Sequence, residues 1–294
     1  MKKIDKENID PKVFSLYDDY AHNRMERREF IEKLSIYAVG SLTLTSLMSF
    51  IMPNYDVIQV GQNDPKLKTE TIEYASSKGG GNIKAQLSRP KNAKGKLPGI
   101  VVVHENRGLN PHIADVGRRA AMAGFISISP DALTPLGGYP GNDDDGRTMQ
   151  RKRDRNEMLE DFIAAHEYLT NHKECDGNVG VVGFCFGGWI SNMMAVKVPD
   201  LKAAVPFYGG QPSKEMVTQI KAPLLLHFGE LDTRVNAGWP DYEKALKAND
   251  KEYKAHTYAN ANHGFHNDTT ARYDKKSAEL AWDRTIDFFK ENLK

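Results

Sequence analysis

The sequence predicts an α/β protein with a mostly parallel central sheet, helices on both faces and a helical N-terminal extension. Apolar runs alternate with amphipathic stretches of helix length from residue 99 to residue 293. Strands that are apolar throughout and separated by helices are typical of a parallel sheet covered on both sides. The chain has 294 residues, of which 40% are hydrophobic, enough for one large domain and a modest extension.

Residues 1–52 form the predicted extension. Arg27-Arg28 precedes residues 35–52 (SIYAVGSLTLTSLMSFIM), which carry no charge. This order resembles a twin-arginine export signal, although no clear A-x-A cleavage site follows. Eighteen apolar residues could just span a membrane, whereas the Ser and Thr within the run favour a helix packed on the domain or on another subunit. We therefore expect a cytoplasmic protein, with periplasmic export or membrane anchoring through residues 35–52 as alternatives.

Residues 53–68 contain Pro, Gly, Asn and Asp and are predicted to be a linker. The catalytic domain is expected over residues 69–294. It begins with β-like runs at residues 70–76 and 83–89, and the glycine-rich turn between them predicts a hairpin.

The remaining elements follow in alternation. Strands are predicted at residues 99–104, 125–129, 179–183, 203–208, 223–229 and 253–258, and helices at residues 111–123, 149–171, 188–197, 240–249 and 271–293. Residues 134–148 (TPLGGYPGNDDDGRT) are predicted to be a solvated loop at the edge of a cleft, which could act as a lid. Their aspartates lack the spacing of a calcium loop.

Charge and cysteine content exclude several classes of function. The 40 Lys and Arg residues balance 39 Asp and Glu residues, so the net charge favours no nucleic acid partner. The two cysteines, Cys175 and Cys185, are too few for a disulfide framework, and no Cys/His spacing is typical of structural zinc. We expect no metal and no cofactor, and a small-molecule substrate. The sequence is compatible with a homo-oligomer.

The most distinctive motif is Gly183-Phe184-Cys185-Phe186-Gly187. It has the frame G-x-S-x-G, with cysteine at the centre, directly after an apolar run. In α/β hydrolases this frame is the sharp strand-to-helix turn that exposes the nucleophile at the edge of the sheet. A cysteine there attacks as the thiolate, which a helix N-terminus and a neighbouring imidazole both favour.

An acid and a histidine follow later strands in the order expected of a hydrolase triad. Asp232 follows residues 223–229, and His263 follows residues 253–258. Glu230 competes with Asp232 for the role of the acid, and Asp232 could instead cap the next helix. His256 and His266 are alternatives to His263, which we favour because it comes just past the last strand.

From about residue 70 to 293, the sequence resembles the dienelactone hydrolase (carboxymethylenebutenolidase) family of α/β hydrolases. The resemblance rests on these residues and on His104-Glu105-Asn106-Arg107-Gly108. The resemblance implies that Cys185 is the nucleophile, His263 its base and Asp232 the residue that orients His263. It also implies that Glu105 is a gate that contacts the thiol and accepts its proton. The alternative for Glu105 is a salt bridge to Arg107.

The same framework predicts the groups around the reacting atoms. The Phe186 N–H and the N–H of Asn106 are the expected oxyanion donors. Four aromatic residues are candidates for the lining of the substrate pocket: Tyr139, Trp189, Tyr208 and Phe265.

The substrate class is broader than dienelactone itself. Members that cleave dienelactone carry arginines for the substrate carboxylate after the Pro-Asp turn and after the histidine, and this chain has none after Pro130-Asp131 or His263. Arg107, Arg234 and Arg272 remain candidate anion contacts. We expect hydrolysis of an ester, lactone or thioester through a thioacyl-enzyme; acyl transfer and a non-catalytic, redox-sensing binding protein are the alternatives.

Overall fold

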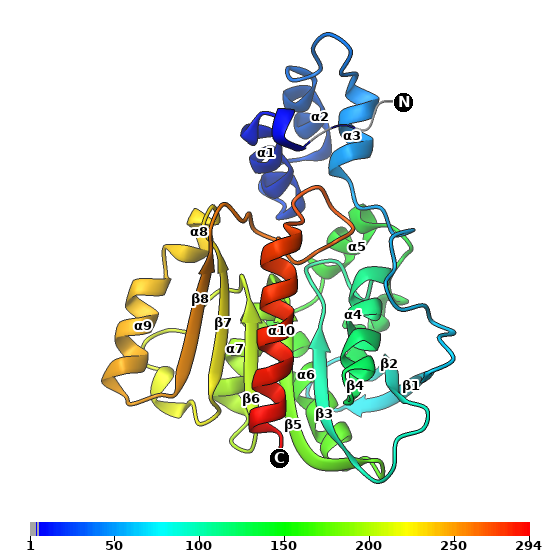
Figure 1. The fold of residues 1–294 in the computed structure, drawn as a ribbon, viewed down its shortest axis with the longest axis vertical. Helices are drawn as coiled ribbons and strands as arrows, with labels where there is room; N and C mark the ends of the chain where they lie inside the picture. Colours follow the sequence, from blue (N-terminus) through cyan, green and yellow to red (C-terminus); the bar gives the residue numbers. More distant parts are fainter. Residues whose placement is uncertain (1–3, 5) are drawn as a thin grey trace.

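The computed structural model describes residues 4 and 6–294 and has one eight-stranded sheet with helices on both faces (Figure 1). The strands are β1 (Leu67–Ser76), β2 (Gly81–Pro90), β3 (Leu97–Val103), β4 (Ile126–Pro130), β5 (Cys175–Phe184), β6 (Ala203–Phe207), β7 (Leu224–Gly229) and β8 (Tyr253–Tyr258). The α-helices are α1 (Pro11–Ala21), α2 (Arg27–Ser35), α3 (Leu44–Ile51), α4 (Pro111–Met122), α5 (Asp143–Gln150), α6 (Arg155–Thr170), α7 (Phe186–Lys197), α8 (Thr233–Asn236), α9 (Trp239–Ala248) and α10 (Lys275–Asn292). Short 3-10 helices lie at Lys6–Asn8, Thr134–Leu136 and Val217–Gln219.

The strand order is β1-β2-β4-β3-β5-β6-β7-β8. The predicted hairpin is present, since β1 pairs with β2 in antiparallel fashion, and β2 is also antiparallel to β4. From β4 to β8 all neighbouring strands are parallel. The carboxyl ends of these parallel strands therefore meet at one edge of the sheet, which is where α/β folds bind their ligands.

Two apolar cores fill the spaces between the sheet and its helices. On one face, Val101 and Val181 pack with residues of α6, α7 and α9. On the other face, Val102 and Val182 pack with residues of α4 and α10. Neighbouring strand residues point to opposite faces, so the continuous apolar runs follow directly from burial on both sides.

The predicted loop at residues 134–148 is wrong in part. Residues 143–150 form α5, which Asn142 caps by accepting a hydrogen bond from the backbone N–H of Asp145 at 2.9 Å. The three aspartates lie in the first turn of this helix, where negative charge interacts favourably with the helix dipole. The helix predicted from residue 149 accordingly begins later, at Arg155, with Asp154 as its N-cap.

The extension forms a small unit of three helices, α1 to α3, with its own apolar core. Phe30, Leu34, Leu47 and Ile51 are fully buried in that core. The uncharged run at residues 35–52 is not one helix, because it contains only the last residue of α2, Ser35, and the whole of α3, Leu44–Ile51. Within the described residues, no helix combines the length and the hydrophobicity that a bilayer crossing requires. The division of the chain at residues 52 and 68 stays a prediction.

This unit lies over the carboxyl ends of the parallel strands (Figure 1). Its contacts with the rest of the chain are largely polar. The last carbonyls of α1 have no partner within the helix, and side chains of the catalytic domain bind two of them: Arg147 binds Tyr20 O and Asn106 binds Ala21 O, both at 2.6 Å. The C-terminus of α1 therefore points at the edge of the sheet where the triad was predicted.

Candidate active site

Cys185 lies between β5 and α7 in a strained backbone conformation. Its φ of 57° and ψ of −109° lie in a region that residues with a side chain rarely adopt. The turn is held by a hydrogen bond from the Cys185 N–H to Phe207 O at 3.1 Å. Because the residue directly precedes α7, its sulfur lies beside the free N–H groups of the first helical turn.

Glycines allow this turn to pack tightly against its neighbours. A Cβ on Gly187 would meet Val103 O at 2.5 Å and His104 O at 2.7 Å. A Cβ on Gly183 would meet Gly187 O at 2.0 Å. Side chains at either position would force the backbone apart, so the glycines of the motif are required by close approach.

Asp232 and His263 form a buried pair. The Nδ1 of His263 donates to Asp232 Oδ2 at 2.5 Å, while Asp232 Oδ1 accepts from the backbone N–H of Val235 at 3.2 Å. Asp232 therefore caps α8 and also holds the imidazole. Burial acts to raise the pKa of Asp232, but the charge of His263 and its hydrogen bond outweigh burial and lower it. The competing acid, Glu230, is exposed and instead accepts from the Asn260 N–H.

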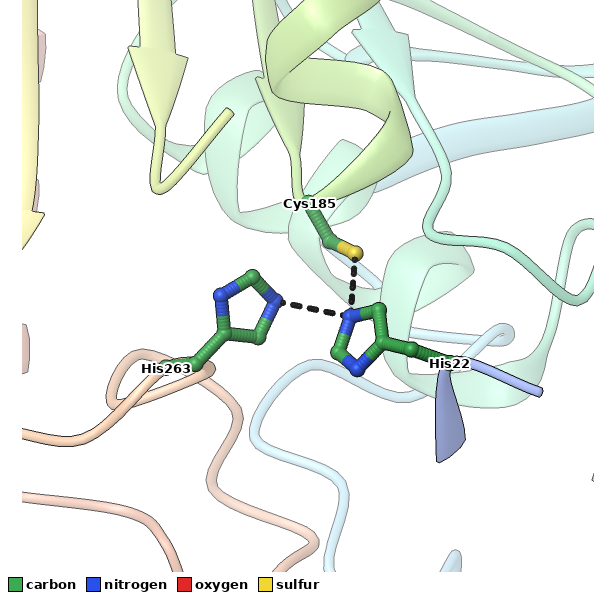
Figure 2. A group of neighbouring side chains, drawn as sticks. All are labelled: His22, Cys185 and His263. Carbon is green, nitrogen blue, oxygen red and sulfur yellow. Dashed lines mark hydrogen bonds between the residues drawn. The ribbon is translucent and has the colours of Figure 1, made fainter. Parts of the chain in front are cut away.

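A histidine from the extension completes the group (Figure 2). His22 directly follows α1, and its Nε2 lies 3.2 Å from Cys185 Sγ and 3.2 Å from His263 Nε2. Its Nδ1 lies 2.7 Å from the backbone oxygen of Asp18. In this conformation the hydrogen-bond partner of the thiol is His22 rather than His263, although the ligand atoms of all three residues lie within 4.8 Å of one another.

The surroundings of His22 favour its protonated form. Burial acts to lower the pKa of His22, but the negative charge of Cys185 and the hydrogen bond to Asp18 raise it above its ordinary value. The Asp18 carboxylate is itself paired with Arg24 at 2.7 Å and Arg272 at 3.0 Å. The ring whose protonated form is favoured therefore has its Nε2 beside the sulfur.

Glu105 is buried and contacts Asn267 and Arg107. Its Oε2 accepts a hydrogen bond from Asn267 Nδ2 at 3.1 Å and lies 3.3 Å from Arg107 Nη2. Burial acts to raise the pKa of Glu105, and the Arg107 charge lowers it more. Among the described residues, the hydrogen bonds of Glu105 include none to Cys185. The contact considered as the alternative, the salt bridge to Arg107, is the one present.

The two predicted oxyanion donors flank Cys185. Phe186 is the first residue of α7, so its N–H has no partner within the helix. Asn106 follows β3, the strand that neighbours β5. Its side chain is occupied by the extension, through the bond to Ala21 O, so Asn106 connects α1 to the predicted oxyanion site.

Two of the four aromatic candidates contact a residue of the predicted triad: the Trp189 backbone N–H donates to Cys185 O at 3.2 Å, and the side chain of Tyr208 packs against His263. The Tyr208 ring lies 4.9 Å from that of His263. Phe265 is fully buried in the core, and Trp189 stacks at 3.4 Å under the guanidinium of Arg155. Tyr139 donates to Asp143 at 3.1 Å, near α5.

A cleft of about 370 Å³ opens beside His263 and Asp232, with α1 as its opposite wall. Of the three arginines considered as anion contacts, Arg234 is exposed and lines this cleft. Arg107 is buried and ion-paired with Glu105 and Asp143. Arg272 also borders the cleft, but it is buried and paired with Asp18. Arg234 is therefore the arginine best placed to meet an anionic group in the cleft.

Comparison with known families divides the chain into two parts. A family model described as the dienelactone hydrolase family matches residues 83–293. A second model, described as YqhI-like, matches residues 1–39. His22 therefore falls outside the hydrolase match and inside the second one.

Individual proteins that are similar to this chain support the match to the dienelactone hydrolase family. A Synechocystis protein named "Putative carboxymethylenebutenolidase" is 32% identical over 232 residues, which cover 72% of this chain and 93% of the relative. The protein usf of Aquifex pyrophilus is 34% identical over 240 residues, covering 76% of this chain and 99% of that protein. A solved structure named as a "Putative Dienelactone Hydrolase" from Klebsiella pneumoniae superposes with a TM-score of 0.67 at 28% identity, covering 76% of this chain and 99% of its own.

Proposed function

Since the chain belongs to the dienelactone hydrolase family of α/β hydrolases, we propose that it cleaves an ester, lactone or thioester bond with Cys185 as the nucleophile. The observation that carries this proposal is the strained strand-to-helix turn at Cys185, with the His263–Asp232 pair at the same edge of the sheet. A strained nucleophile turn of this kind is a feature of α/β hydrolases.

The reaction would proceed in two steps. The Cys185 thiolate attacks the carbonyl carbon, while His263 holds the proton of the thiol and then gives it to the leaving alcohol or thiol. Water, deprotonated by His263, then hydrolyses the thioacyl-enzyme. Asp232 keeps the Nδ1 proton of His263 in place and stabilises the imidazolium.

Charge that develops on the carbonyl oxygen needs hydrogen-bond donors. The N–H groups of Phe186 and Asn106 are the donors in this proposal, and losing one such donor typically costs about 100-fold or more in rate. His22 Nε2 lies 3.2 Å from both the sulfur and His263 Nε2 (Figure 2), so in this proposal the His22 ring moves aside before His263 contacts the thiol.

The cleft of about 370 Å³ is lined by His263 and Asp232 but not by Cys185. Its volume supports a small substrate. The relative from Synechocystis is named for the cleavage of a carboxymethylenebutenolide, but this chain lacks arginine at the two positions where the family binds the substrate carboxylate. We therefore propose a wider range of small esters, lactones or thioesters rather than dienelactone alone.

Acylation by p-nitrophenyl acetate tests the proposal. Intact-protein and peptide mass spectrometry should find one acetyl group on Cys185, accompanied by release of p-nitrophenol. His263→Ala should abolish both, and Asp232→Asn should slow turnover by several orders of magnitude. Cys175→Ala is the matched control, because Cys175 is the other cysteine and lies buried at the start of β5. Folded protein that shows neither the adduct nor turnover would refute the proposal, as would an adduct on Cys175.

A further inference from the structure

His22, Cys185 and His263 bring three metal-binding atoms together from distant parts of the chain. Two nitrogens and one sulfur lie within 4.8 Å of one another (Figure 2). Cys185 and His263 are buried and His22 is nearly so. This cluster exists only because α1 lies over the edge of the sheet, and the hydrolase family match does not include His22.

The hydrogen bonds of the two imidazoles leave both Nε2 atoms facing the cluster. The partner of His22 Nδ1 is a backbone oxygen at 2.7 Å, which can only accept, so Nδ1 carries a proton. The partner of His263 Nδ1 is the Asp232 carboxylate at 2.5 Å, so this nitrogen also donates. In neutral rings both Nε2 lone pairs then point into the same space, only 3.2 Å apart. Either a proton on His22 Nε2 or a metal ion that displaces this proton removes the repulsion.

The same arrangement is typical of zinc ligands. Metal-binding histidines usually donate their other N–H to a carboxylate or a backbone carbonyl, which fixes the ring and its tautomer. Here His263 has the first kind of partner and His22 the second. Ideal tetrahedral zinc would place two nitrogens about 3.4 Å apart and a sulfur about 3.6 Å from each nitrogen. Two of the three observed separations, both 3.2 Å, lie close to these values, whereas Cys185 Sγ and His263 Nε2 are only within 4.8 Å of each other.

We propose that His22, Cys185 and His263 form a binding site for Zn²⁺ or a metal ion of similar preference, and that the bound ion switches off hydrolysis. One thiolate and two imidazoles leave the fourth tetrahedral position to water. Binding releases the thiol proton to solvent as the Zn–S bond forms. In this proposal Cys185 Sγ and His263 Nε2, which lie within 4.8 Å of each other, move closer when the ion binds.

Inhibition follows from the overlap of the two sites. The ion would occupy the thiolate and the imidazole nitrogen that hydrolysis needs. This second half of the inference rests on the proposed function, whereas metal binding itself does not. Because His22 supplies one ligand, the ion would also join the extension to the catalytic domain.

Cobalt spectroscopy tests binding without any turnover. Full-length protein, stripped of metal by a chelator, is titrated with Co²⁺. We expect a thiolate-to-cobalt charge-transfer band and tetrahedral d–d bands that saturate at one equivalent and disappear when Zn²⁺ is added. Cys185→Ala should lose the charge-transfer band and Cys175→Ala should keep it. A missing band in the folded wild-type protein would overturn the proposal, even if the enzyme hydrolyses esters.

Substitution of His22 separates this site from nonspecific capture of zinc by the thiol. His22→Asn should weaken Zn²⁺ binding by at least about 100-fold, measured by competition with a chromophoric chelator. Removal of a group that only hydrogen-bonds to a metal ligand typically costs about 10- to 100-fold, and loss of a ligand itself should cost at least as much. His22→Cys retains a ligand and should bind Zn²⁺ far more tightly than His22→Asn. His172→Asn, a change of the same kind near Cys175 and outside the cluster, should bind as the wild type does. Circular dichroism verifies that each variant is folded.

Activity is then measured with each variant's rate divided by its own metal-free rate. Stoichiometric Zn²⁺ should reduce wild-type hydrolysis at least about 10-fold, EDTA should restore it, and His22→Asn should be insensitive. Equal inhibition of wild type and His22→Asn would overturn the role of His22, and an increase in the wild-type rate would overturn inhibition. If the cobalt bands form but the stripped enzyme never acylates, the proposed hydrolysis fails and the metal site stands.

Discussion

Gly187 is a position where the turn around Cys185 tolerates little change. Gly187→Ala would place a methyl group 2.5 Å from a backbone oxygen of β3. We expect a loss of about 1–3 kcal/mol of unfolding free energy, measured by urea denaturation, together with slower acylation of Cys185. Gly61→Ala is the control, because nothing lies within 4 Å of a Cβ at that position. Equal stability of the two variants would contradict this prediction.

Arg234 is expected to select anionic substrates. It is exposed and lines the cleft beside His263, with its Nη2 3.4 Å from His263 Nδ1. Arg234→Ala should raise KM for an ester that carries a carboxylate by about 10-fold, the equivalent of one charge-assisted hydrogen bond. The rise should be smaller for a neutral ester of the same size. Steady-state kinetics with a matched pair of esters measures this difference.

Arg28→Ala serves as the control for that experiment. Arg28 is 92% exposed and pairs with Glu32 on the same helix. If the two arginine variants change KM equally, or if Arg234→Ala affects both esters alike, Arg234 does not contact an anionic group of the substrate.

At the level of single residues, the sequence predicted that Asp232 and His263 would pair, but it did not predict that His22 would contact the sulfur. Asp232 and His263 could be found because each directly follows a core strand. His22 could not, because it lies 163 positions before Cys185 and no strand precedes it. Asp10-Pro11, an N-cap residue followed by proline at the first helical position, was the available signal for α1. Nothing in that signal indicates which surface the helix covers, so the proposed metal ligands could not be recognised from their spacing.

At the level of elements, the segment between α3 and β1 is more firmly held than the prediction of a linker suggests. The backbone N–H groups of Gln59 and Val60 donate to the two carboxylate oxygens of Asp115 in α4, at 3.0 and 2.9 Å. Arg119 bonds both Asp115 and Asp268, and Asp268 also accepts from Gln59 at 2.6 Å. The segment is therefore fixed both to α4 and to the loop after β8.

This network predicts a dependence of stability on pH. Burial acts to raise the pKa of Asp268, but His112 and Arg119 outweigh it and hold the pKa below its ordinary value. Such a group stabilises the fold above the ordinary pKa of aspartate, about 3.9, and loses this contribution as the pH falls through its lower pKa in the folded state. Asp268→Asn should therefore cost about 2 kcal/mol at pH 7, and the difference from wild type should shrink below about pH 4.

Urea denaturation over a pH series measures the effect. Asp56→Asn, which changes an exposed aspartate of the same segment, should differ little from wild type at any pH. A deficit of Asp268→Asn that stays constant from pH 7 to below pH 4 would show that the charge of Asp268 does not contribute.

Most strands and helices were predictable because their hydrophobic patterns are strong. Helix α5 was not, because its sequence lacks such a pattern. Strands β3, β6 and β7 are buried along most or all of their length, so their apolar pattern identifies them directly, whereas β8 is only partly buried. Residues 143–150 contain three aspartates and a glycine, which have poor helix propensity. Here the cap at Asn142, the helix dipole and the contact of Asp143 with Arg107 outweigh propensity. These effects depend on partners that a local reading of the sequence does not include.

For the whole molecule, attachment of the extension should control access to the sulfur. Arg147 is buried, binds Tyr20 O at 2.6 Å and lies 4.0 Å over the Tyr20 ring. Arg147→Ala should loosen α1 and α2, increase their backbone hydrogen exchange, and speed alkylation of Cys185 by iodoacetamide about 10-fold. Peptide-resolved mass spectrometry measures both. The exposed Arg28→Ala serves again as the control, and unchanged exchange and alkylation in Arg147→Ala would refute this role for the contact.

The overall arrangement was predictable only in part. The order of strands and helices predicted the α/β sheet, and the Ser and Thr residues favoured packing of the extension over membrane insertion. The position of the extension follows from contacts between the end of α1 and two side chains, Asn106 and Arg147, that lie far along the chain. These are single hydrogen bonds with no periodic pattern, so sequence analysis had no means of finding them.

The position of α1 also affects how readily Cys185 is oxidised. Peroxide converts an accessible thiolate to sulfenic acid and then irreversibly to sulfinic acid. The Cys185 residue is only 9% exposed, and the His22 ring lies against its sulfur. Peroxide can therefore reach this sulfur only when the helices open, and the rate of irreversible damage should follow the frequency of opening. The extension that limits access of substrate to Cys185 would therefore also slow its irreversible oxidation.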